Sequence, residues 1–180
     1  MGNYDYQFSY EFYADGSINI EVRASGYIQA AYYAHNEEYG YHIHDALSGS
    51  MHDHVLNYKV DFDILGTNNT MTTVENIPVS EVYPWSSGQA RNTMKLNRSI
   101  IANEDDAKLY WTANGQTQYK VVNLDVPNKY GEPRGYRLLP SAGTAHLVIQ
   151  NSSNLARAAN WATHDLYVTK QKDTEQRSAQ

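Results

Sequence analysis

Strict alternation of apolar and polar side chains is the feature that most constrains how this chain folds. Aromatic side chains occupy every second position from Tyr4 to Phe12, and polar ones lie between them. Because successive side chains of a strand point to opposite faces, the pattern predicts a strand with one apolar face. Asp15-Gly16 is a turn signal, and alternation resumes from Ile18 to Val22. We therefore predict an antiparallel hairpin over residues 4–25.

Most of the remaining chain is also predicted to form strands. Alternation is cleanest from His52 to Ile64, where we expect a long strand with one buried and one polar face. The other expected elements are strands over residues 27–33, 71–79, 119–126, 135–139, 145–150 and 165–169, loops over residues 35–50 and 80–118, the latter with one or two short strands, and one modest helix over residues 155–163. These elements predict an all-β fold, a largely antiparallel β-sandwich.

Composition excludes several classes of protein. The chain has 180 residues, of which 41% are hydrophobic, enough for one domain with a real core. Its 14 basic and 20 acidic side chains give a net charge of −6, the wrong sign for binding nucleic acid or anionic lipid mainly by overall charge. No apolar run approaches the roughly 20 residues of a membrane-spanning helix. Localisation stays open.

Of two His-x-His pairs, His52 and His54 are the candidate metal ligands. A chain with no cysteine must hold a metal through histidine and carboxylate. In a strand, side chains two residues apart lie on one face about 7 Å apart, so two imidazoles converge on one ion. His52 and His54 share the parity of the apolar positions, and we expect both rings to enter the interior. Satisfied core histidines are the alternative. His42 and His44 are expected to be surface residues of a loop.

The order of these motifs resembles the catalytic domain of the copper amine oxidases. Asn3-Tyr4-Asp5-Tyr6 is followed downstream by His52-Asp53-His54 and then by Asp61-Phe62-Asp63. The similarity continues through residues 129–137 and 161–170, and so spans essentially the whole chain.

The resemblance implies a cofactor and a metal. In the family, the tyrosine of such a motif is oxidised to topaquinone by the enzyme's own copper and dioxygen. Tyr4 is then the topaquinone precursor, with Asn3 and Asp5 beside it, and His52 and His54 are copper ligands.

A second metal site is also implied. Asp61 and Asp63, with the main-chain carbonyl of Phe62, match the family's peripheral site for calcium or another divalent cation. Hard carboxylate and carbonyl oxygens suit calcium. Solvated strand carboxylates are the alternative.

The implied reaction is oxidative deamination of a primary amine by dioxygen to an aldehyde, ammonia and hydrogen peroxide, in a homodimer. The resemblance also implies that residues 1–180 are part of the catalytic domain, truncated at both ends, without the family's catalytic aspartate and third copper histidine. We therefore expect the chain alone to be inactive. One alternative is a non-catalytic β-sandwich module that binds sugar or protein through exposed members of its 16 tyrosines. The other is a metal-dependent β-protein without quinone.

Overall fold

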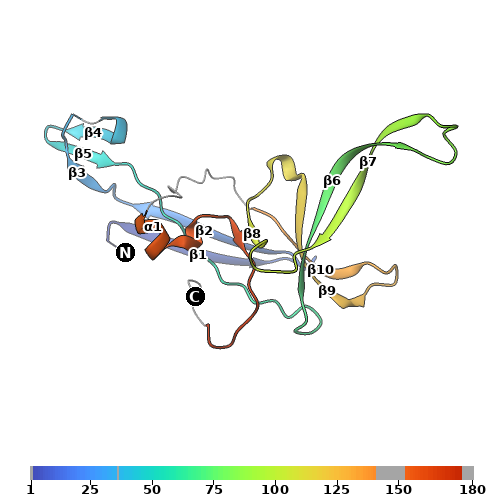
Figure 1. Ribbon diagram of the computed structural model, residues 1–180. Coiled ribbons are helices and arrows are strands. Elements are labelled where there is room, and N and C mark those ends of the chain that lie inside the picture. Colours follow the sequence, from blue (N-terminus) through green and yellow to red (C-terminus); the bar gives the residue numbers. More distant parts are fainter. Residues whose placement is uncertain (1, 36, 141–152, 176–180) are drawn as a thin grey trace. The chain divides into compact units, whose positions relative to one another are not determined.

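Antiparallel strands build two compact units (Figure 1). The computed structural model describes residues 2–35, 37–140 and 153–175. The described residues up to Val55 form the first unit, and those from Leu56 onward form the second. Every strand pair in the described residues is antiparallel, which confirms the predicted all-β, antiparallel fold class. No helix in this described part is long and apolar enough to cross a membrane.

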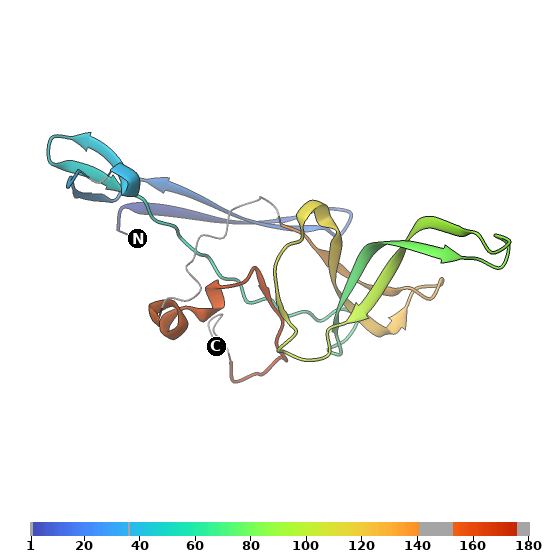
Figure 2. The ribbon, with the colours of Figure 1, turned by 45° about the horizontal axis from the view of Figure 1, so that its top comes forward.

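The first unit begins with the predicted hairpin, a long two-stranded ribbon in Figure 2. Its strands are β1 (Tyr4–Phe12) and β2 (Ile18–Gly26). The register places Phe8 opposite Val22 and Tyr10 opposite Ile20. Such aromatic and β-branched pairs contribute about 0.2–1 kcal/mol each. The turn uses Gly16 with a φ of 88°, a backbone conformation that glycine adopts without steric cost.

A second sheet in this unit corrects the loop predicted over residues 35–50. It has the order β3–β5–β4. Its elements are β3 (Ala30–Tyr32), the 3₁₀ helix η1 (Glu37–Tyr39), β4 (Gly40–His44) and β5 (Leu47–Ser50). The glycines of this segment favoured a loop in the sequence, but in the structure they let two strands approach closely. A Cβ on Gly40 would lie 1.9 Å from the carbonyl oxygen of Gly49.

The second unit is centred on a four-stranded sheet of order β10–β9–β6–β7. Its strands are β6 (Thr70–Val82), β7 (Ala90–Ile100), β9 (Thr117–Pro127) and β10 (Pro133–Leu138). The buried side chains of Met71, Val74, Tyr119 and Val122 form its core. All four come from the two central strands, because these have neighbours on both edges.

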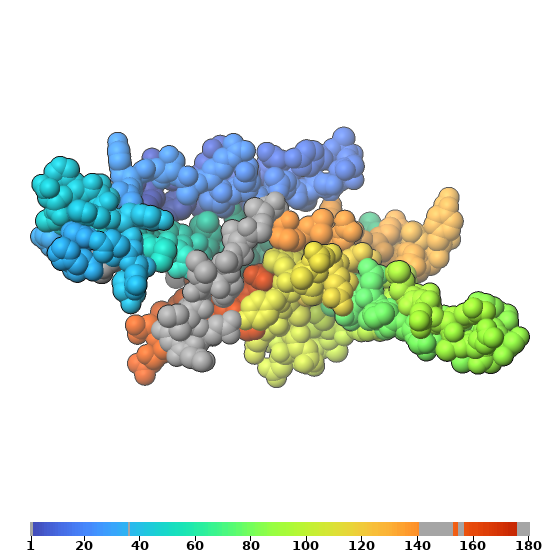
Figure 3. All heavy atoms as spheres, turned by 90° about the horizontal axis from the view of Figure 1, so that it is seen from above, coloured from blue at the N-terminus to red at the C-terminus, as the bar shows by residue number. Residues whose placement is uncertain are grey.

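The β6–β7 hairpin corrects two predictions. β7 falls where loops with short strands were expected, and all 11 of its residues are exposed, so no buried face imposes alternation on the sequence. β6 continues through Pro78, which was expected to end it. Beyond Glu75, β6 pairs with β7 alone, so one edge is open and a residue without an N–H is tolerated. Figure 3 shows the far half of the hairpin, in green, as a projecting lobe of its unit.

The long strand expected over residues 52–64 is absent from the described structure, where residues 51–63 belong to no strand. Alternation favours an extended chain, but a strand also needs a hydrogen-bonded neighbour, and no described strand pairs with this segment.

The remaining elements are short. They are β8 (Lys108–Leu109), η2 (Ala113–Gly115), α1 (Ser153–Ala158), η3 (Asn160–Ala162) and β11 (Leu166–Tyr167). The single helix predicted over residues 155–163 is therefore divided into α1 and η3. The strand expected over residues 145–150 lies outside the described residues.

Asn123 ties the segment before β6 to the centre of the second unit. Its side chain is 2% exposed, and its amide donates to the carbonyl oxygens of Ile64 at 2.9 Å and Leu65 at 3.3 Å. Its own oxygen accepts the N–H of Asp125 at 2.9 Å. One buried amide therefore satisfies backbone groups of two segments.

Replacing this amide should destabilise the second unit. We expect Asn123→Ala to lower the free energy of unfolding by about 1–3 kcal/mol, because buried backbone groups lose their partner. Asn92→Ala, on exposed β7, should change it by no more than about 0.5 kcal/mol. Urea unfolding followed by tyrosine fluorescence measures both, and equal midpoints for the two variants would contradict this role.

Candidate metal and cofactor site

Four aromatic rings of the first unit gather at one place. Tyr4 and Tyr6 lie on the same face of β1, and His52 and His54 follow β5. The ring centroids of Tyr4 and His54 are 4.7 Å apart, and those of the two histidines are 5.0 Å apart. The hydroxyl of each tyrosine is hydrogen-bonded to the histidine 48 residues after it. The Tyr4–Tyr6 pair therefore faces the His52–His54 pair, which has the same two-residue spacing.

The hydrogen bonds of His52 define which of its nitrogens carries the proton. Nδ1 lies 2.9 Å from the carbonyl oxygen of Ser50, which only accepts, so Nδ1 donates. In the neutral ring Nε2 is then an acceptor, and the Tyr4 hydroxyl 2.7 Å away donates to it. The Nε2 lone pair of His52 is therefore directed at the oxygen of Tyr4.

His54 is held differently. Its Nδ1 is hydrogen-bonded to the hydroxyl of Tyr6, a group that both donates and accepts. This bond leaves Nε2 outside the contact. Tyr6 was not among the predicted site residues, although its position two residues after Tyr4 matches the spacing of His52 and His54.

Backbone contacts position the start of β1. The carbonyl oxygen of Asn3 accepts the N–H of Tyr27 at 2.9 Å, and the Asn3 side chain donates to the carbonyl oxygen of Ile28 at 3.1 Å. Gly26 lies opposite Tyr4 with a φ of 124°, and a Cβ there would be 2.2 Å from the Asn3 oxygen. The residue before Tyr4 is thus held by close backbone packing.

The expected interior position of the two histidines is wrong, because both side chains are exposed in the structure. Without a paired strand over residues 52–64, parity no longer assigns one side of the segment to a core. Asp5 is also exposed and lies opposite Ser25, on the other face of β1 from Tyr4.

The second histidine pair is exposed, as predicted, but lies on strand β4 rather than in a loop. His42 stacks on Tyr33 with centroids 3.8 Å apart, and His44 lies 3.3 Å from the Asp45 carboxylate. The Tyr33 hydroxyl donates to the Glu37 carboxylate, and this bond lowers the pKa of Glu37 from its ordinary value. The side chains around this pair therefore contact neighbouring aromatic and acidic residues of the first unit.

Asp61 and Asp63 are exposed on either side of Phe62, which is half-buried and lies 6.3 Å from the Tyr136 ring. The Asp61 carboxylate accepts a hydrogen bond from Gln171 at 3.0 Å. Across the described residues, no three His, Cys, Asp or Glu side chains form a group that would hold a metal ion.

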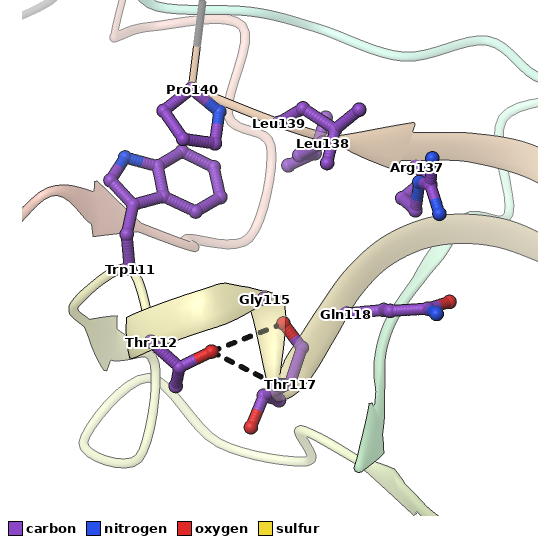
Figure 4. Close-up of a pocket in the computed structure, with 9 residues that line it drawn as sticks. All are labelled: Trp111, Thr112, Gly115, Thr117, Gln118, Arg137, Leu138, Leu139 and Pro140. Carbon is purple, nitrogen blue, oxygen red and sulfur yellow. Dashed lines mark hydrogen bonds between the residues drawn. The ribbon is translucent and has the colours of Figure 1, made fainter. Parts of the chain in front are cut away.

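A cavity of about 180 Å³ lies in the second unit (Figure 4). Trp111, Leu138, Leu139 and Pro140 form its apolar wall, and Arg137 is the charged residue of its lining. Thr112 accepts the N–H of Thr117 at 2.9 Å on the opposite side. This lining lacks the paired tyrosine and imidazole groups of the first unit.

The protein-family model for the copper amine oxidase enzyme domain matches residues 1–180 of this chain. The chain belongs to the copper amine oxidase family. The copper amine oxidase vicK1 of Bipolaris victoriae is 55% identical over 97% of this chain and 25% of its own length. Among solved structures, the amine oxidase of Aspergillus nidulans has 64% identity and a TM-score of 0.90, covering 100% of this chain and 24% of that one.

A lysyl oxidase of Pichia pastoris is 43% identical, with a TM-score of 0.88 over 99% of this chain and 24% of that one. The chain therefore spans about a quarter of the length of these copper amine oxidases.

The ring cluster suits the family's metal. Imidazole nitrogens are ligands that copper favours. His52 directs an unprotonated nitrogen into the cluster, and a phenol oxygen lies beside that nitrogen. The two imidazoles of the cluster therefore have the ligand chemistry that a copper site needs, and the Tyr4 phenol lies beside them.

The close packing at Gly26 yields a test of how Tyr4 is positioned. We expect Gly26→Ala to displace Asn3 and Tyr4, because the new Cβ overlaps the Asn3 oxygen, and to remove the nuclear Overhauser contacts between the Tyr4 and His52 rings. Gly16→Ala is the matched control, since Gly16 also has a positive φ but has nothing within 4 Å of an added Cβ. Intact ring contacts in Gly26→Ala would show that the glycine does not position Tyr4.

Proposed function

We propose that this chain is the part of a primary-amine oxidase catalytic domain that carries the cofactor tyrosine and two copper ligands. The whole protein, a homodimer extending beyond both ends of residues 1–180, converts primary amines and dioxygen to aldehydes, ammonia and hydrogen peroxide. The observation that supports this function is the 2.7 Å contact between the Tyr4 hydroxyl and Nε2 of His52. The tyrosine of the cofactor motif and a nitrogen ligand of the His-x-His pair meet directly.

In this proposal Tyr4 is the topaquinone precursor, and His52 and His54 hold copper through their imidazole nitrogens. Bound copper, with dioxygen, supplies the oxidising power that makes a quinone of the tyrosine ring. The proton of the Tyr4 hydroxyl and the metal compete for one lone pair on His52. With copper held by His52, Tyr4 would have to release or redirect this proton, because Nε2 could no longer accept it.

Asn3 and Asp5 flank the cofactor in different ways. The Asn3 amide bonds the Ile28 carbonyl and so holds the backbone that precedes Tyr4. Asp5 lies on the opposite face of β1 and, in this proposal, affects the cofactor only through the strand.

Asp61, Asp63 and the carbonyl of Phe62 are proposed as oxygen ligands of a peripheral calcium ion. The half-buried Phe62 anchors the segment and leaves both carboxylates facing solvent. The chain alone is expected to be inactive, because residues 1–180 hold no motif that matches the family's catalytic aspartate or its third copper histidine.

Copper loading in air tests the assignment of Tyr4. In a form of the protein extended on both sides to the length of its relatives, we expect copper to generate a coloured quinone that reacts with a quinone-specific stain. Tyr4→Phe should abolish the colour and the release of hydrogen peroxide from benzylamine while still binding copper, because the two imidazoles remain. Tyr10→Phe, on the exposed part of β1, should keep both.

A colourless wild-type protein that binds copper would contradict the proposed oxidase and favour a metal protein without quinone. A wild-type protein that binds no copper would favour the binding module.

Terbium luminescence tests the peripheral site. Terbium stands in for calcium, and Tyr136 beside Phe62 is a suitable sensitiser. We expect Asp61→Asn combined with Asp63→Asn to remove the calcium-displaceable signal, since each substitution removes a hard anionic ligand. Asp173→Asn, at another exposed carboxylate, should retain it. A signal unchanged by the double substitution would exclude this ion site.

A further inference from the structure

We propose that Tyr6 is a positioning residue for His54: its hydroxyl oxygen accepts the Nδ1 proton, which leaves the Nε2 lone pair for copper. This inference rests on the proposed function, because it assumes that His54 is a copper ligand. Tyr6 is the second tyrosine of β1, and the proposed oxidation of Tyr4 gives it no role.

The argument begins with the two nitrogens of the imidazole ring. A neutral ring carries one proton, and a metal binds the nitrogen that lacks it. In the structure Nδ1 of His54 bonds the Tyr6 hydroxyl, so Nε2 is the nitrogen left for a metal. Once Nε2 holds a cation, Nδ1 must carry the proton, and the phenol oxygen becomes its acceptor. Ligating histidines commonly have such a partner, which fixes the tautomer and ring orientation.

The other histidine shows the same arrangement with a different acceptor. Nδ1 of His52 donates to the Ser50 carbonyl, and Nε2 faces the cluster. Both histidines thus engage Nδ1 in a bond and keep Nε2 for another partner. A carbonyl accepts only, so His52 has its tautomer set in advance. A phenol oxygen both accepts and donates, so the Tyr6 hydroxyl can accept a proton carried on Nδ1 of His54.

A substitution can separate the effect of the Tyr6 hydroxyl from that of its ring. The ring centroid lies 5.7 Å from His54 and 6.3 Å from Tyr4, so the ring also packs within the cluster. Tyr6→Phe keeps this packing and removes only the acceptor for Nδ1. Tyr10, further along β1 and 55% exposed, provides a matched loss of one hydroxyl.

The experiment measures copper binding without the oxidation chemistry. All variants carry Tyr4→Phe in the extended protein, so no quinone forms and copper(II) affinity is read by competition with a chelator. We expect Tyr6→Phe to weaken copper binding by about 10–100-fold, the usual effect of losing such a partner. Tyr10→Phe should leave the affinity unchanged.

A spectroscopic readout separates positioning from general loosening of the site. Pulsed electron paramagnetic resonance detects the remote nitrogen of each copper-bound imidazole, whose quadrupole coupling depends on the hydrogen bond at its N–H. We expect Tyr6→Phe to shift the coupling of one remote nitrogen and leave the other, held by Ser50, unchanged.

The outcomes are distinct. Copper binding in the Tyr4→Phe background, with the same affinity and remote-nitrogen couplings after Tyr6→Phe, would overturn the role of Tyr6 and leave the proposed oxidase intact. A shift of both remote nitrogens would also overturn it, because the effect would not be specific to His54. No copper binding in the Tyr4→Phe background would remove the proposed copper ligands and this inference with them.

Discussion

Backbone pairing between β1 and β2 is the constraint on which the ring cluster depends. Their register sets Tyr4 opposite Gly26, and the two-residue period of the strand places Tyr6 on the same face. Asn3 packs so closely on Gly26 that a side chain there would collide with it. The two tyrosines are therefore presented together to whatever segment approaches that face, here the one after β5.

The side-chain bonds of the cluster lie on an exposed surface, and a typical hydrogen bond adds only about 0.5–1.5 kcal/mol of net stability. The order of the site consequently comes from the backbone that carries the rings more than from the bonds between them. Ser50 illustrates this, because its place at the end of β5 brings its carbonyl to Nδ1 of His52. The two histidines differ in what contacts Nδ1. The Ser50 carbonyl only accepts a proton from His52, whereas the Tyr6 hydroxyl can accept one from His54 or donate one to it.

In the second unit, burial decides where sequence patterns are informative. Val74 and Val122 lie in central strands with buried faces, and the predicted strands there are present. β7 has no buried face, so its residues carry no alternation and the strand was missed. The opposite error occurred over residues 52–64, where alternation was clear but no described strand pairs with the segment.

The sequence alone determined the antiparallel hairpin, the all-β class and the residue types of the site, because alternation and motif spacing are local properties of the chain. It also supplied the resemblance that the comparison with the copper amine oxidase family confirmed. Only the tertiary structure brought Tyr4 to His52 and Tyr6 to His54, and only it assigned a proton to Nδ1 of His52. These contacts join residues 48 apart, and their geometry depends on strand pairing and on a carbonyl that no side-chain pattern records.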